Sequence, residues 1–109
     1  MDEQKLRDIY RDLMQMNRKC FEGEKFDIAY HALMAALHCA QELKDIPYLQ
    51  EIERAANEQL KYIDAHHAEY EHSTAAASKR NHVSIFQTLA RQANARIVII
   101  QNTPRHMRP

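Results

Sequence analysis

Histidine side chains gather in the second half of the chain, between positions 66 and 82. Imidazole and carboxylate groups are common ligands of zinc and related divalent ions. Glu69 and His72 have the i, i+3 spacing found in di-iron helical bundles, although no second Glu-x-x-His pair supplies the other half of such a site. We therefore hypothesise a mononuclear metal site, with zinc as the example, formed by five residues: His66, His67, Glu69, His72 and His82.

A basic segment is the second feature that could bind a ligand. All 15 acidic residues and nine of the 15 basic ones lie in positions 1–71, for a net charge of −6, whereas positions 72–109 carry +6. On one helix, Arg80 and Arg91 would share an outward face that phosphate groups could follow. The alternative is that this segment packs beside acidic surfaces, within the fold or between two copies. No base-reading module is present, so we do not expect nucleic acid to be the main partner.

The remaining reactive side chains do not form a catalytic pattern. His38 and Cys39 are adjacent, so on a helix they point about 100° apart. His31 and His38 are seven residues apart, about 10.5 Å along a helix, which is too far for one ion. We predict a protein that is not an enzyme and that needs no cofactor apart from the hypothesised metal ion.

These residues must be positioned by helices. One glycine and three prolines among 109 residues do not supply the turns that an all-β chain needs. Apolar residues recur at three- and four-residue spacing instead. The start of the last helix is open, because Ser73 or Thr74 could cap an early start and Ser78 a later one. The predicted helices cover residues 2–22, 25–44, 47–70 and a fourth segment that ends by Asn102.

Local signals separate the first three helices. Gly23 is the one glycine, and we expect it to adopt the left-handed conformation that closes the first helix. Asp45 and Pro47 mark the end of the second helix and the start of the third.

The second helix begins with apolar residues at helical spacing: Phe26, Ala29, Leu33, Ala36 and Leu37. With Gly23 before it, this segment resembles the second half of a tetratricopeptide unit over about fifteen residues. The pattern does not recur some 34 residues further on, the period of such repeats. We therefore predict no internal repeat.

The predicted setting is a reducing one. The first ten residues carry charges and no apolar run, which argues against a signal or transit peptide. No segment approaches the roughly 20 apolar residues of a membrane span. Cys20 and Cys39 would lie roughly 20 Å apart in a helical hairpin, so we expect two free thiols. We predict a cytoplasmic protein with no membrane contact.

Together these patterns predict an all-α protein, an antiparallel up-down four-helix bundle. It would form a single domain over residues 1–103, with a flexible tail at 104–109. Tyrosines and methionines widen the apolar stripes, which is typical of interfaces. The leading hypothesis is a protein–protein interaction module or homodimer. The alternatives are a metal-binding bundle that uses the histidine-rich end and a weak nucleic-acid or phosphate binder that uses the basic helix.

Overall fold

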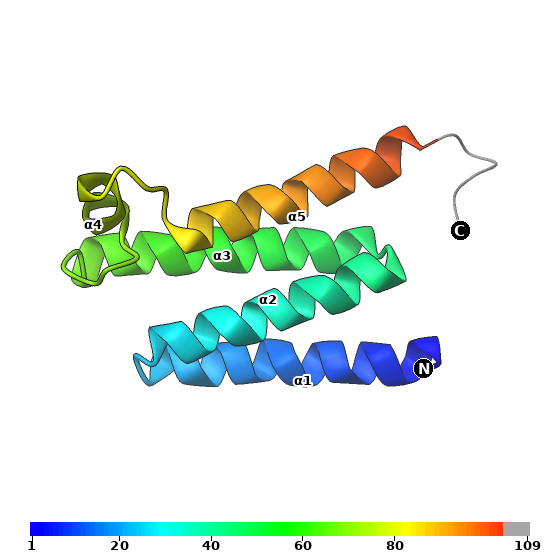
Figure 1. The fold of residues 1–109 in the computed structure, drawn as a ribbon. Helices are drawn as coiled ribbons and strands as arrows, with labels where there is room; N and C mark the ends of the chain where they lie inside the picture. The colour runs from blue at the N-terminus through cyan, green and yellow to red at the C-terminus, as the bar shows by residue number, and fades with distance from the viewer. Residues whose placement is uncertain (104–109) are drawn as a thin grey trace.

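A computed structural model of the chain describes residues 1–103, and these residues form five α-helices and no strand. The all-α prediction is confirmed. The prediction for residues 104–109 lies outside the described residues. The long helices reverse direction one after another along the chain, and a short helix lies between the last two of them (Figure 1). Their bounds are α1 Glu3–Glu22, α2 Phe26–Leu43, α3 Ile46–His66, α4 Thr74–Lys79 and α5 Ile85–Asn102.

Side-chain caps define where most of these helices begin. The Asp2 carboxylate accepts a hydrogen bond from the backbone N–H of Lys5 at the start of α1, and Asp45 does the same for Tyr48 in α3. Serine hydroxyls cap α4 and α5. Such caps satisfy backbone donors that have no partner inside the helix.

The turn between α1 and α2 differs from the prediction at one residue. Gly23 has φ −82°, and the left-handed residue is Glu24, with φ 61°. The N–H of Gly23 bonds to the carbonyl of Lys19, so the helix ends at Glu22 as predicted, and only the left-handed residue comes one position later. The prediction of a left-handed Gly23 is wrong, although the chain does reverse there.

The predicted fourth helix is two helices. Helix α3 ends at His66 rather than Tyr70, and residues 67–73 form a turn-rich connection to α4. Ser73 begins α4, and Ser84 begins α5 after a break that contains Asn81 at φ 58°. The break separates Lys79 from Ile85, in the part of the chain where the sequence left the start of the last helix open.

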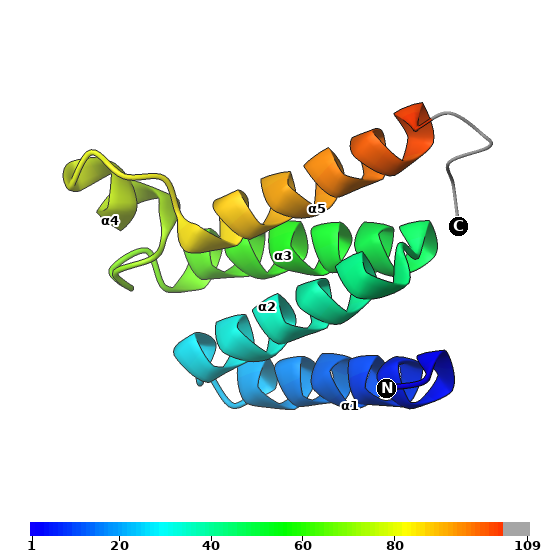
Figure 2. The same cartoon turned by 45° about the vertical axis from the view of Figure 1, so that its right-hand side comes forward.

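The long helices pack as two hairpins side by side rather than as a closed square. The most extensive contact is between α1 and α2, followed by that between α3 and α5. Helix α2 also lies against α3 and, more lightly, against α5. The helices therefore follow one another across a flattened body of 47 × 27 × 17 Å (Figures 1 and 2). This arrangement does not by itself confirm the predicted four-helix bundle.

The core lies between the two hairpins. On α2, fully buried alanines alternate with leucines, and these small side chains let α1 approach closely. The two thiols, half-buried Cys20 and buried Cys39, are free. Within the described residues, no helix is long and apolar enough to cross a lipid bilayer. The largest fully buried side chains include Tyr10, Leu33, Leu37, Leu49, Ile52, Ile63, Phe86 and Leu89.

Candidate functional site

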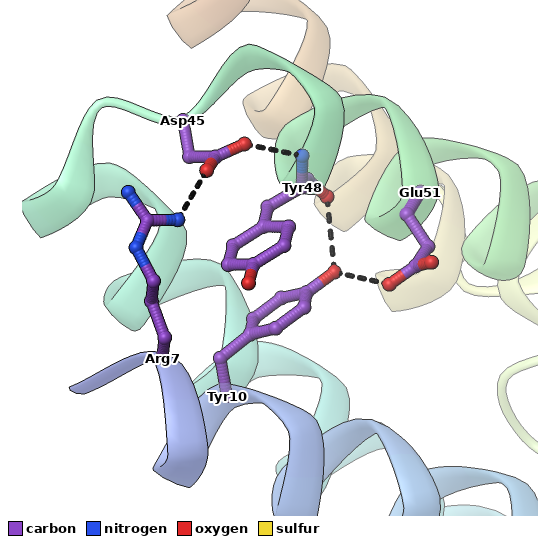
Figure 3. Close-up of polar contacts among 5 residues, drawn as sticks. All are labelled: Arg7, Tyr10, Asp45, Tyr48 and Glu51. Carbon is purple, nitrogen blue, oxygen red and sulfur yellow. Dashed lines mark hydrogen bonds and ion pairs between the residues drawn. The ribbon is translucent and has the colours of Figure 1, made fainter. Parts of the chain in front are cut away.

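At the end of the molecule where α3 begins, α1 and α3 meet through a polar and aromatic network. We call its five residues the Tyr10 network: Arg7, Tyr10, Asp45, Tyr48 and Glu51 (Figure 3). The rings of Tyr10 and Tyr48 stack with centroids 3.9 Å apart and planes 7° apart. The Tyr10 hydroxyl donates to Glu51 Oε1 at 2.5 Å, and Arg7 Nη1 lies 2.6 Å from Asp45 Oδ2. Every charged group in this network has an opposite charge or a hydroxyl as its partner.

Burial makes the Tyr10 phenol strongly dependent on these partners. Its ring is 1% exposed, and burial is the largest cause that raises the pKa of Tyr10, followed by the hydrogen bond to Glu51. The phenol is therefore held in its neutral, proton-donating form. The Arg7 guanidinium also lies 5.4 Å from the centre of the Tyr48 ring, within cation–π range. This network joins the two hairpins and needs no ligand to do so.

Two buried amides form a second link between α1 and α3. Asn17 Nδ2 donates to Gln59 Oε1 at 3.1 Å and to the Ala29 carbonyl at 2.8 Å, and Gln59 Nε2 donates back to Asn17 Oδ1 at 2.6 Å. Asn17 is 0% exposed. The reciprocal pairing explains how a polar side chain is tolerated between three helices.

A group of exposed apolar side chains lies on the first hairpin. Ile9 and Met16, 37% and 50% exposed, are two turns apart on one side of α1. Ile28, 53% exposed, begins an apolar stripe on α2 whose later members Ala32 and Cys39 are buried. Helix α1 is the main neighbour of α2, so we expect this stripe to lie near the seam between them. We call Ile9, Met16 and Ile28 the hairpin face, and helical spacing puts it on the side away from α3.

The five residues of the predicted metal site do not lie in one group. His66 is exposed, with its ring centroid 4.5 Å from that of Tyr62. His67 Nε2 lies 3.6 Å from a Glu24 oxygen, while its Nδ1 lies 3.7 Å from a Glu69 oxygen. The two carboxylates therefore approach different nitrogens of the same ring. A single ion cannot use both contacts.

His72 belongs to a different set of groups. Among residues 1–103, one set of at least three metal-capable side chains has ligand atoms within 4.8 Å of one another, and it consists of Asp27, Glu71 and His72. We call these three residues the Asp27 cluster. His82 is exposed in the connection before α5 and is not part of it. Of the five residues in the predicted metal site, only His72 is placed with other ligand groups in this way.

Tyr70 lies beside the Asp27 cluster. Its hydroxyl donates to Asp27 Oδ1, and its ring packs edge-on against His72 with centroids 5.5 Å apart. Burial is the largest cause that raises the pKa of Tyr70, followed by the hydrogen bond to Asp27. As at Tyr10, a neutral phenol donates to a carboxylate.

The predicted anion-binding residues lie on different helices. Arg80 is the C-cap of α4, and its Nη2 donates to the Glu71 carbonyl at 2.7 Å. Arg91 lies on α5, where it lines a shallow depression of about 330 Å³ together with Glu53 of α3. The basic helix thus packs beside an acidic one, as the intramolecular alternative expected. A phosphate track from Arg80 to Arg91 would have to cross the break before α5.

Comparison with protein-family models, with curated proteins and with solved structures gave no match to this chain. Sequence reasoning missed two residues of the cluster: Glu71, which stands beside the predicted His72, and Asp27. Asp27 is far from Glu71 in the chain, and nothing in its local spacing marks it as a ligand. The adjacent Glu71 and His72 were the only local signal of the cluster.

Proposed function

We propose that the protein is a protein-interaction module that binds a second copy of itself through the hairpin face. The observation that carries this proposal is the exposure of three large apolar side chains on one hairpin: Ile9, Met16 and Ile28. Each isolated exposed apolar residue would be ordinary, but apolar side chains gathered on one surface are typical of interfaces. Leu13 and Cys20, both half-buried on α1, add apolar surface between them.

Charge supports a second copy as the occupant. Lys5 and Lys19 border the hairpin face on α1, at four and three residues from Ile9 and Met16. Glu42 borders it on α2, fourteen residues after Ile28 and so on the same side of that helix. Asp12 lies on the same side of α1, three residues from Ile9 and four from Met16. In a two-fold dimer with α1 of each copy over α2 of the other, Lys5 and Lys19 would approach Glu42 of the second copy.

We also propose a helical arrangement and a cellular compartment for this interaction module. The four long helices would act as one antiparallel four-helix unit, with α4 as an insertion between α3 and α5. The free thiols at Cys20 and Cys39 support a reducing compartment such as the cytoplasm.

The oligomeric state of purified protein over a range of concentrations tests this proposal. Light scattering coupled to size exclusion should give a dimer that dissociates on dilution. Met16→Glu should weaken the dimer at least about 30-fold, because the lost apolar contact appears twice and about 1 kcal/mol is expected from each copy. Circular dichroism should report unchanged helix content.

Val98→Glu provides the matched control. Val98 is 45% exposed, close to the value for Met16, but it lies on α5, at the other edge of the array. It should leave the dissociation constant unchanged. A strict monomer at high concentration, or equal weakening by both substitutions, would overturn self-association through this face.

A further inference from the structure

We propose that Asp27, Glu71 and His72 bind a divalent first-row metal ion, for which zinc is the appropriate probe. Asp27 lies in the first turn of α2, and the other two residues lie in the connection between α3 and α4. Their ligand atoms lie within 4.8 Å of one another. An ion at this position would tie the start of α2 to that connection.

The charges around the cluster favour a cation. Two carboxylates lie close together there, and no lysine or arginine nitrogen of residues 1–103 comes within 4.0 Å of either. The Arg80 guanidinium reaches this segment, where it bonds to the backbone carbonyl of Glu71 rather than to a carboxylate of the cluster. A divalent ion would compensate the charge of both carboxylates, which the Tyr70 hydroxyl on Asp27 and the His72 imidazole 3.7 Å from Glu71 offset only in part.

Groups outside the cluster hold each ligand residue. The Ser84 hydroxyl donates to the His72 carbonyl at 2.6 Å, and Arg80 Nη2 donates to the Glu71 carbonyl at 2.7 Å. The Tyr70 hydroxyl donates to Asp27 and leaves the second carboxylate oxygen available. Supporting hydrogen bonds of this kind orient metal ligands and strengthen binding.

The donor set fits zinc chemistry. One imidazole and two carboxylates are a borderline set that zinc accepts, with a fourth position for water. Tetrahedral ligands at zinc are about 3.4 Å apart, given bond lengths near 2.1 Å. The cluster must therefore contract by about an ångström. Asp27 and Glu71 are exposed, so their side chains can rotate to do so.

Zinc binding to the metal-free full chain tests this inference. Isothermal titration with zinc chloride, with metal analysis after dialysis, should give one ion per chain. Asp27→Asn and His72→Ala should each weaken binding at least about tenfold. Zinc should also raise the melting temperature of the wild type and not of these variants, and circular dichroism of each variant checks that it folds.

His66→Ala is the matched control, because His66 is exposed and lies outside the cluster. It should leave affinity and stoichiometry unchanged. Three results would overturn the inference: no binding at micromolar zinc, undiminished binding by folded Asp27→Asn, or equal weakening by His66→Ala. None of them bears on self-association, which is measured in metal-free protein.

Discussion

The two ends of the helical array use the same kinds of side chain in opposite ways. The Tyr10 network and the Asp27 cluster each place a tyrosine hydroxyl on a carboxylate. In the Tyr10 network, Arg7 also neutralises Asp45. In the Asp27 cluster, two carboxylates and an imidazole converge without a cation from residues 1–103 within ion-pair distance.

This difference indicates that the Tyr10 network stabilises the fold, whereas the Asp27 cluster keeps groups available for a ligand. Partnered charges and a stacked ring pair join α1 to α3, so a substitution there should cost stability. The exposed carboxylates of the Asp27 cluster have a tyrosine hydroxyl and an imidazole as partners rather than an arginine, so they contribute less to folding and keep oxygen lone pairs for a ligand. We call the end that holds the Tyr10 network the structural end and the end that holds the Asp27 cluster the receptive end.

The largest expected effect is at the Tyr10 ring. Tyr10→Ala should lower the free energy of unfolding by about 3–5 kcal/mol, because it removes a fully buried aromatic side chain and its stacking contact with Tyr48. Urea denaturation followed by circular dichroism measures this. Tyr62→Ala, at a ring that is 41% exposed, should cost much less. Similar losses for the two variants would show that the Tyr10 network is not the stronger link.

A smaller effect is expected in alkaline solution. Burial and Glu51 raise the pKa of Tyr10 in the folded state, so the unfolded chain ionises first, near pH 10. The stability due to this neutral phenol is complete below that pH and is lost as the pH rises above it. The advantage of wild type over Tyr10→Phe should therefore shrink by about 1.4 kcal/mol between pH 9 and pH 11. An advantage that stays constant would contradict the raised pKa.

The smallest effect is expected at the receptive end. In metal-free protein, Glu71→Ala should change the free energy of unfolding by less than about 0.5 kcal/mol, because Glu71 is exposed and its ion-pair contact is the His72 imidazole at 3.7 Å. Asp45→Ala should cost about 1 kcal/mol from the lost helix cap alone. Thermal denaturation of the two variants compares them. Equal losses would remove the contrast between the two ends.

Local signals in the sequence predicted where the first three helices begin, although α3 ends at His66 and not at Tyr70. Asp2 and Asp45 cap helices where capping chemistry predicts, and the all-α class follows from glycine and proline usage. The break between α4 and α5 depends on contacts from elsewhere in the fold. The Ser84 hydroxyl that begins α5 also donates to the carbonyl of His72, and helical periodicity cannot report such a bond.

The candidate sites also differ in how far local sequence signals predict them. The spacing of apolar residues identifies the second stripe of α2, which contains Ile28. The spacing does not predict that Ile28 is exposed while Ala32 and Cys39 are buried. Asp27 meets Glu71 and His72 only because α2 and the connection after α3 reach the same end of the array. Its carboxylate is 44 positions from Glu71 in the chain, so no short motif could have revealed the cluster.

The buried amide pair has a consequence for how the chain folds. Each hairpin is built largely from contacts between neighbouring helices, so we expect both hairpins to form early and then to dock. Asn17 and Gln59 satisfy each other only in the native docking. A slip of one helical turn would bury both amides without partners, at about 1–3 kcal/mol each. The pair therefore favours the native register of the two hairpins over registers shifted by a helical turn.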